Sequence, residues 1–273
     1  MPGHFAKVAE VYTGVRTTDE EPILYIRDRL AGRAAVAAAD IGCGTGRYDL
    51  LLLQHIPGLR LACVDMSREM LTQLSSYLTA NGVDGFEIIN AGVEEMAFDD
   101  RSLDCVLTFN AIHHFDFSSF VAIAGRAIKG DGLIFVYTRT PEQNAGSIWG
   151  QHFPRFCEKE DRLYRLEDMK KWIAEADGLR LIAAETFRYA RTSSLDCLLE
   201  QARNRHYSTF SLYTGEEFEE ACRGFEDNVR RHFHDPGNIE WHDENTLLQI
   251  GPVSTKLSPD ATSQDPAWLN GTV

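Results

Sequence analysis

Short apolar runs alternate with longer amphipathic runs through the first half of the chain. The apolar runs predict strands at residues 36–40, 59–65, 86–90, 103–109 and 133–138. The amphipathic runs between them, at residues 48–55, 68–79 and 121–128, have the spacing of helices with one buried face. This alternation is typical of βαβ units, in which a parallel sheet carries helices on both faces. The pattern therefore predicts an α/β fold with a mostly parallel sheet.

Local signals place two of the boundaries. Ser67 precedes the helix at 68–79, and a serine side chain in that position accepts hydrogen bonds from the free amides of the first turn. The segment Gly130-Asp131-Gly132 predicts a turn between the helix at 121–128 and the next strand, because paired glycines interrupt regular structure.

The alternation stops after Thr140. Residues 141–155 have the composition of a loop with aromatic and polar side chains. Beyond them, periodicity predicts helices at 166–176, 195–204 and 216–233, a bent strand at 179–189 and a last strand at 244–253. The last two helices are longer than a crossover between strands requires, so we expect part of this region to form a lid over a ligand cleft.

These patterns divide the chain into three parts. We expect a helical arm at residues 1–33 and a main domain at residues 34–257, with cap insertions at about 139–178 and 192–240. Residues 258–273 combine Pro, Ser, Asp, Gly and Thr with little periodicity, so we expect a flexible tail.

Composition narrows the class of protein. A chain of 273 residues with 44% hydrophobic content can bury one large core and a modest cap. Its 27 basic and 41 acidic side chains give a formal charge of −14, which disfavours nucleic acid as a partner. No apolar stretch is long enough for a membrane helix and no signal-peptide pattern is present, so we expect a soluble, cytoplasmic protein.

The six cysteines contain no C-x-x-C pair, and we expect reduced, structural thiols. Thiol or metalloid chemistry at Cys157 or Cys197 is the alternative.

The most informative segment is Asp40-Ile41-Gly42-Cys43-Gly44-Thr45-Gly46-Arg47, which joins an apolar run to an amphipathic one. Glycines there allow positive φ and close approach of the backbone to a ligand, at the free amides of a helix N-terminus. The dinucleotide-binding fingerprint needs a glycine where Arg47 stands. A carboxylate just before the turn also suits a cationic ligand group better than a pyrophosphate.

This segment resembles motif I of the class I S-adenosylmethionine-dependent methyltransferases, especially small enzymes similar to those of ubiquinone and menaquinone biosynthesis. The resemblance implies a Rossmann-like, seven-stranded, mostly parallel sheet with helices on both faces and a helical cap or lid. It also implies S-adenosylmethionine as cofactor and S-adenosylhomocysteine as product. The implied contacts in the turn are Asp40, Gly42, Cys43, Gly44 and Gly46.

The resemblance continues at the ends of the next two predicted strands. Asp65 is the expected ligand of the ribose hydroxyls, and Met66 is expected to pack on the adenine. In the following turn the family carries an acidic residue where this chain has Gly92. The amide of Val93, with a backbone carbonyl or Glu94, is then left to bind the adenine.

The fourth similar segment follows the predicted strand at 103–109. Phe109 and Asn110 are expected to line the cleft beside the methionine part of the cofactor. His113 and His114 are candidate general bases, because the pKa of histidine lies near neutrality. The alternative is a structural histidine pair that caps the turn. Adjacent histidines do not easily face one metal ion, and no third ligand lies nearby in sequence, so we expect no metal site.

Residues at the N-terminus and after the fifth strand complete the expected site. Tyr12 and Arg16 resemble a family segment that folds over the cofactor, where Arg16 would bind the methionine carboxylate and Tyr12 would cover the sulfonium. A surface arginine on a frayed arm is the alternative. The expected acceptor pocket comprises residues 139–144 with Trp149 and Phe153, and residues 208–210 are expected to contribute to the lid.

The predicted activity is methyl transfer from S-adenosylmethionine to a small molecule, such as a carboxylate, phenol or quinone-like metabolite. The reaction is an in-line displacement, which an enzyme promotes mainly by alignment. A protein or RNA acceptor and a non-catalytic cofactor-binding module are the alternatives. The acceptor atom, the pathway and the oligomeric state do not follow from the sequence.

Overall fold

The computed structural model describes residues 18–96 and 98–253, which form two compact units. Unit 1 comprises Arg139–Arg165 and Thr186–Thr246, and unit 2 comprises Thr18–Thr138, Leu166–Glu185 and residues 247–253. The predicted insertions at 139–178 and 192–240 overlap unit 1. However, residues 166–178 lie in unit 2.

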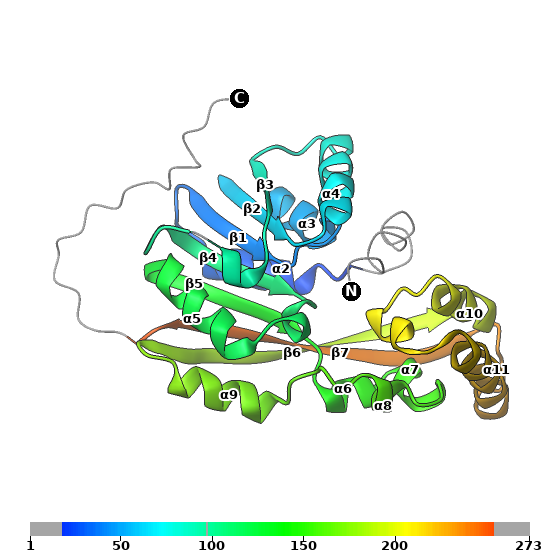
Figure 1. Ribbon diagram of the computed structural model, residues 1–273. Coiled ribbons are helices and arrows are strands. Elements are labelled where there is room, and N and C mark those ends of the chain that lie inside the picture. Colours follow the sequence, from blue (N-terminus) through cyan, green and yellow to red (C-terminus); the bar gives the residue numbers. More distant parts are fainter. Residues whose placement is uncertain (1–17, 97, 254–273) are drawn as a thin grey trace. The chain divides into compact units, whose positions relative to one another are not determined.

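Unit 2 contains the predicted sheet (Figure 1). Its helices are α2 (Glu21–Arg29), α3 (Arg47–His55), α4 (Arg68–Ala80), α5 (Phe117–Ala127) and α9 (Leu166–Glu175), with the short 3₁₀ helices η1 (Val93–Glu95) and η2 (Ile112–His114). Its complete strands are β1 (Val36–Ile41), β2 (Leu59–Asp65), β3 (Phe86–Asn90), β4 (Leu103–Phe109) and β5 (Ile128–Thr138).

The sheet has seven strands in the order β3-β2-β1-β4-β5-β7-β6. The four pairs among β1 to β5 are parallel. Strands β7 (Ile239–Pro252) and β6 (Leu179–Ser193) follow β5 in this order and run antiparallel to each other, as two hydrogen bonds at their opposite ends show. The amide of Val253 donates to the carbonyl of Gly178, and the amide of Leu195 donates to that of Pro236, both at 2.8 Å. The predicted α/β fold with a mostly parallel, seven-stranded sheet is confirmed.

Helices cover both faces of this sheet (Figure 1). Helices α3 and α4 pack on β2, and α5 packs on β4, β5 and α9. The predicted cap of α4 is confirmed, since the Ser67 hydroxyl accepts from the amide of Met70 at 3.3 Å. At the opposite end of the strands, the buried Asp104 carboxylate accepts from Arg33 at 2.8 Å, Lys129 at 3.0 Å and the Ala37 amide at 2.9 Å.

Two predicted boundaries are wrong. The turn expected at residues 130–132 lies inside β5, where a Cβ on Gly132 would stand 2.8 Å from Ile128. The glycine therefore allows a close approach within an irregular strand pair, whose register shifts between Leu103 and Cys105. The loop expected at 141–155 contains two short helices with their own caps, as described below.

Unit 1 contains the ends of β6 and β7 and a set of helices around an aromatic core. The helices are α6 (Pro141–Gly146), α7 (Ile148–His152), α8 (Phe156–Lys159), α10 (Leu195–Arg203) and α11 (Gly215–His232), with the 3₁₀ helix η3 (Ser208–Leu212). Thr140 caps α6 through the amide of Gln143, and Ser147 caps α7 through the amide of Gly150. Side-chain caps thus stabilise two helices that are too short to show helical periodicity in the sequence.

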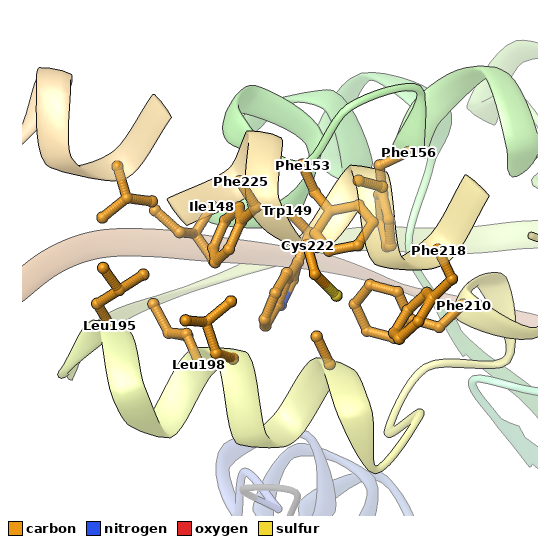
Figure 2. Packing of buried hydrophobic residues seen from close by; sticks show 14 of the residues in the cluster. Ile148, Trp149, Phe153, Phe156, Leu195, Leu198, Phe210, Phe218, Cys222 and Phe225 are labelled. Carbon is orange, nitrogen blue, oxygen red and sulfur yellow. The ribbon is translucent and has the colours of Figure 1, made fainter. Parts of the chain in front are cut away.

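The core of unit 1 is a cluster of buried rings and aliphatic side chains (Figure 2). Trp149 packs on Phe225 with ring centroids 5.0 Å apart, and Phe153 packs edge-on against Phe210 at the same separation. Trp149, Phe153 and Phe210 are at most 3% exposed. The faces of Trp149 and Phe153 are used in this core, which argues against their predicted place in the lining of an acceptor pocket. The contribution of residues 208–210 to a lid stays a prediction.

No helix among the described residues has both the length and the apolar character required to cross a membrane. All six cysteines are free, and Cys63, Cys105 and Cys222 are buried.

Candidate cofactor site

The glycine turn after β1 has the backbone geometry that glycine permits. The φ angles of Gly42, Gly44 and Gly46 are 75°, 59° and 82°, all in the left-handed region. The amides of Gly42 and Cys43 both donate to the carbonyl of Val64, at 2.8 and 3.1 Å, which holds the turn against the end of β2. Helix α3 then begins at Arg47, so its free N-terminal amides face the same edge of the sheet.

The three glycines differ in what surrounds them. A Cβ on Gly42 would lie 2.6 Å from the Cβ of Ala111 and 2.9 Å from a ring carbon of Phe115, and one on Gly46 would lie 2.8 Å from Leu74. These two glycines allow the turn to pack on its neighbours. A Cβ on Gly44 would meet no atom of the described residues within 4 Å. Gly44 is therefore the point at which another molecule can approach the backbone.

Asp65 ends β2 beside this open position. Its carboxylate accepts from the amide of Gly44 at 3.0 Å and from the amide of Ser67 at 2.8 Å. Two backbone donors fix the side chain, and each oxygen retains a second lone pair for a ligand hydroxyl. Met66 follows with 71% of its surface exposed, an apolar side chain available to cover a flat ligand.

Asn90 is a residue of this region that the sequence reasoning missed. It pairs with Asp65 in the β2–β3 register, and its side-chain amide donates to the carbonyls of Asp65 and Met66 at 3.0 Å each. Its place at the end of a predicted strand could have indicated that Asn90 lies near Asp65, since neighbouring parallel strands end at the same edge of a sheet.

The turn after β3 contains Gly92 and Val93. Gly92 has an extended backbone, with φ −77° and ψ 164°, so this position does not require glycine. The carboxylate of Glu95 accepts from the Gly92 amide at 3.1 Å. The family carries an acidic residue at the position of Gly92. In this chain Glu95 places an acidic group at the same turn, and Val93 begins η1.

The end of β4 is aromatic and conformationally strained. Phe109 stacks on Tyr48 of α3 with ring centroids 4.4 Å apart and an interplanar angle of 11°. Asn110 has φ 53°, and its amide donates to the carbonyl of Tyr137 at 2.7 Å. A left-handed asparagine costs on the order of 1 kcal/mol, and such strain is concentrated at functional sites.

His113 and His114 lie on η2, directly after this strand end. Their ring centroids are 4.1 Å apart, with His113 half-buried and His114 exposed. The amide of His114 donates to the carbonyl of Ala111 at 2.9 Å, which closes the turn. The geometry leaves both the general-base and the structural interpretation open. Tyr12 and Arg16 lie outside the described residues.

Three carboxyl groups gather behind the turn. Asp40 of β1 is 1% exposed and Asp49 of α3 is completely buried. The thiol of Cys63, which pairs with Asp40 in the sheet register, donates to Asp49 Oδ1 at 3.2 Å. Burial raises the pKa of Asp49 to about 7 and raises that of Asp40 well above its usual range, with repulsion from Asp65 adding to both.

These residues fit a ligand that carries hydroxyl groups and a positive charge. Asp65 offers carboxylate acceptors next to the open position at Gly44. Asp40 Oδ1 and Thr45 Oγ1 are buried and have no hydrogen-bond partner among the described residues. Buried polar atoms without partners are costly, so they indicate groups that a bound molecule would satisfy.

Comparisons with known proteins agree with this geometry. Residues 39–136 match the family described as "Methyltransferase domain". The uncharacterized methyltransferase YcgJ of Bacillus subtilis is 27% identical over 173 residues, which cover 62% of this chain and 67% of that protein. The uncharacterized methyltransferase Rv3342 of Mycobacterium tuberculosis is 28% identical over 121 residues, 44% of this chain and 47% of that protein.

Solved structures show the same fold. The crystal structure of YcgJ has a TM-score of 0.59 at 18% identity and covers 86% of this chain and 100% of that chain. Geranyl diphosphate C-methyltransferase from Streptomyces coelicolor, solved with S-adenosylhomocysteine, has a TM-score of 0.53 at 16% identity. The match covers 85% of this chain and 80% of that chain.

The narrower similarity to the enzymes of ubiquinone and menaquinone biosynthesis stays a prediction. The family match begins at the residue before Asp40 and ends within β5, so it includes the turn, Asp65, Gly92, Asn110 and the histidine pair. Residues 39–136 are therefore a methyltransferase domain, and the fold is that of the class I S-adenosylmethionine-dependent methyltransferases, which use S-adenosylmethionine as cofactor.

Proposed function

We propose that this enzyme methylates a small molecule, with the cofactor held at the edge of unit 2 formed by β1, β2, β3 and β4. The observation that carries the proposed site is the hydrogen bond from the open Gly44 to the Asp65 carboxylate. It joins a backbone position that a ligand can reach to a fixed acceptor for ligand hydroxyls.

The predicted site residues that the structure describes have proposed roles consistent with their positions. Asp65 binds the ribose hydroxyls, and the exposed Met66 packs on the adenine. The amide of Val93 binds the adenine edge. Asp40 attracts the positive charge of the methionine part, and Asn110 lies beside that part at the end of β4.

The turn residues Gly42, Cys43, Gly44 and Gly46 shape the cradle, and Phe109 packs beside it. Tyr12 and Arg16 keep their predicted roles as a cover for the cofactor.

The chemistry follows from alignment. When bound, S-adenosylmethionine supplies an electrophilic methyl group on a positively charged sulfur. The residues around the turn fix the donor in one orientation, and the aromatic pair Tyr48 and Phe109 limits the access of water to its methionine part. Holding donor and acceptor in line accounts for most of the rate enhancement expected of such a displacement. His113 or His114 accepts the acceptor's proton if the methylated group is a hydroxyl or amine.

A small acceptor is favoured by charge and by a structural relative. The formal charge of −14 opposes binding of RNA. Geranyl diphosphate, a small molecule, is the substrate of the Streptomyces relative of the same fold. A protein acceptor and a non-catalytic cofactor-binding module remain the competing hypotheses.

Calorimetric titration with S-adenosylmethionine, S-adenosylhomocysteine and NAD tests the cofactor site. We expect micromolar binding of the first two ligands, none of NAD, and binding weakened by about 1–3 kcal/mol in Asp65→Ala. Asp84→Asn, an exposed carboxylate outside the site, is the matched control. Transfer of a labelled methyl group to a metabolite extract, and not to denatured cell protein or RNA, would support the small-molecule acceptor. Label in protein or RNA would contradict it.

A further inference from the structure

Asp49 is the buried acidic residue that the proposed roles leave unexplained. It lies in the first turn of α3, immediately after the glycine turn, and its side chain has no exposure to solvent. The Asp49 carboxyl group accepts the weak donor of the Cys63 thiol at Oδ1 and a hydrogen bond from its own backbone amide, and Oδ2 has no hydrogen-bond partner among the described residues. A carboxylate in that position would be an unsolvated charge.

The groups around Asp49 do not neutralise it. Asp40 faces it from β1, Asp65 and Cys63 from β2, and Cys43 from the turn, and all of these are acidic. None of the ion pairs among the described residues includes Asp40, Asp49 or Asp65. A buried carboxyl group beside two others takes a proton in preference to a charge.

The remaining charged groups near α3 have partners at the surface. Arg47 donates to the hydroxyl of Thr18 at 3.0 Å, and His55 pairs with Glu20 at 2.6 Å. Helix α4 meets the start of α3 through the apolar Leu74. The acidic cluster therefore lacks a nearby cation among the described residues that could hold Asp49 in its charged form.

We propose that Asp49 is a further residue of the cofactor site, which holds a proton when the site is empty and releases it when the positively charged cofactor binds. The inference rests on the proposed site, since it concerns the same cofactor. On binding, the carboxyl O–H bond breaks, the proton passes to solvent, and a carboxylate remains to balance the ligand's charge.

The proposal gives the enzyme a means of distinguishing substrate from product. S-adenosylmethionine carries a sulfonium charge, whereas S-adenosylhomocysteine lacks the transferred methyl group and has a neutral thioether in its place. Loss of that charge on methyl transfer removes the attraction that kept the cluster ionised. Asp49 then takes up a proton again, and the product is held less tightly than the substrate.

Calorimetry in two buffers of different ionisation enthalpy counts the protons released per ligand. Near pH 7 we expect S-adenosylmethionine to release up to one proton and S-adenosylhomocysteine fewer. Below the pKa of the empty site, affinity for S-adenosylmethionine should rise up to about tenfold per pH unit, and more steeply than affinity for the product. The amino group common to both ligands cancels in this comparison.

Asp49→Asn preserves the shape of the side chain and removes its proton. We expect this variant to bind the cofactor with fewer protons released and a flatter pH dependence, while Asp84→Asn behaves as wild type. Equal proton release by wild type and Asp49→Asn, or by the two ligands, would overturn the proposal. No binding of S-adenosylmethionine by the wild type would instead refute the proposed site itself.

Infrared difference spectra of the wild-type protein provide a test that does not need a variant. Binding of S-adenosylmethionine should remove a carbonyl band of a protonated carboxyl group and add a carboxylate band. A spectrum in which no protonated carboxyl band disappears would exclude proton release from this cluster, even if Asp49→Asn fails to fold.

Discussion

Gly42 and Gly44 allow stability and cofactor binding to be separated by one kind of substitution. Both have φ in the left-handed region, at 75° and 59°, so Gly→Ala introduces backbone strain at each. They differ in surroundings, because the new methyl group would meet Ala111 and Phe115 at position 42 and empty space at position 44.

The expected magnitudes follow from this difference. Left-handed alanine costs about 1 kcal/mol, which is the whole expected loss of stability in Gly44→Ala. Gly42→Ala adds overpacking, since contacts of 2.6 and 2.9 Å lie well inside van der Waals distance. Overpacking costs about 1–3 kcal/mol, so the total for Gly42→Ala is about 2–4 kcal/mol. The thermal midpoint should fall by about 2–4 °C for Gly44→Ala and by roughly two to four times as much for Gly42→Ala.

The order should be reversed for cofactor affinity, which should fall more in Gly44→Ala than in Gly42→Ala. In Gly44→Ala the methyl group occupies the approach to the backbone, so we expect a loss of affinity of at least about tenfold, or 1.4 kcal/mol. The strain at this position is small, and the Gly44 amide can still donate to Asp65.

Thermal unfolding by circular dichroism and titration with S-adenosylmethionine, both on the same preparations, measure the two effects. Wild-type affinity in Gly44→Ala would refute the proposed approach of the ligand at Gly44, because the open side of the turn would then face no ligand. Equal destabilisation of Gly44→Ala and Gly42→Ala would refute the difference in packing between the two positions.

Four further predictions concern the carboxylates and the histidine pair. Asp65→Asn should weaken cofactor binding by about 1–3 kcal/mol in calorimetry, because one buried acceptor becomes a donor. Asp104→Ala should lower the free energy of unfolding in urea by about 2–4 kcal/mol with little effect on cofactor affinity, since Lys129 loses its carboxylate partner and Arg33 keeps only the exposed Asp131. Burial raises the pKa of Asp49 to about 7, so the folded state holds the extra proton. Wild-type stability relative to Asp49→Asn should therefore fall as pH rises from about 4 to about 7, by up to about 1.4 kcal/mol per pH unit in urea titrations. If either histidine is the general base, His113→Ala or His114→Ala should lower kcat by about 10²-fold or more, and full turnover in both would exclude that role.

The meeting of the glycine turn with Asp65 was predictable because parallel sheets align strand ends. A glycine turn after one strand and a carboxylate after the next must meet when the strands pair in register, as the hydrogen bond between Gly44 and Asp65 shows. The same reasoning would have found Asn90, which occupies the equivalent place on β3. It was missed because an asparagine at a strand end is also a common turn residue.

The region after β5 was less predictable because its stability comes from non-local packing and local caps. Trp149 and Phe153 are aromatic residues near the carboxyl edge of a sheet, a pattern shared by pocket linings and by cores. Their assignment depends on Phe210 and Phe225, which follow them by dozens of residues in sequence. Trp149 lies on α7, which is too short for periodicity to reveal, and Ser147 caps the start of that helix. Phe153 follows its end.

Asp49 shows that a buried acidic residue in an otherwise apolar helix face can indicate a functional site. The amphipathic pattern of α3 predicts an apolar residue on the face toward β2, and Leu50 and Leu52 agree with it. An aspartate there costs stability that leucine or alanine would not, because no ion pair among the described residues includes it and its Oδ2 has no hydrogen-bond partner among them. Such a cost is expected at a functional site. Beside a cofactor whose charge changes by one unit on methyl transfer, an acid with a pKa near neutrality converts that change into a difference in affinity.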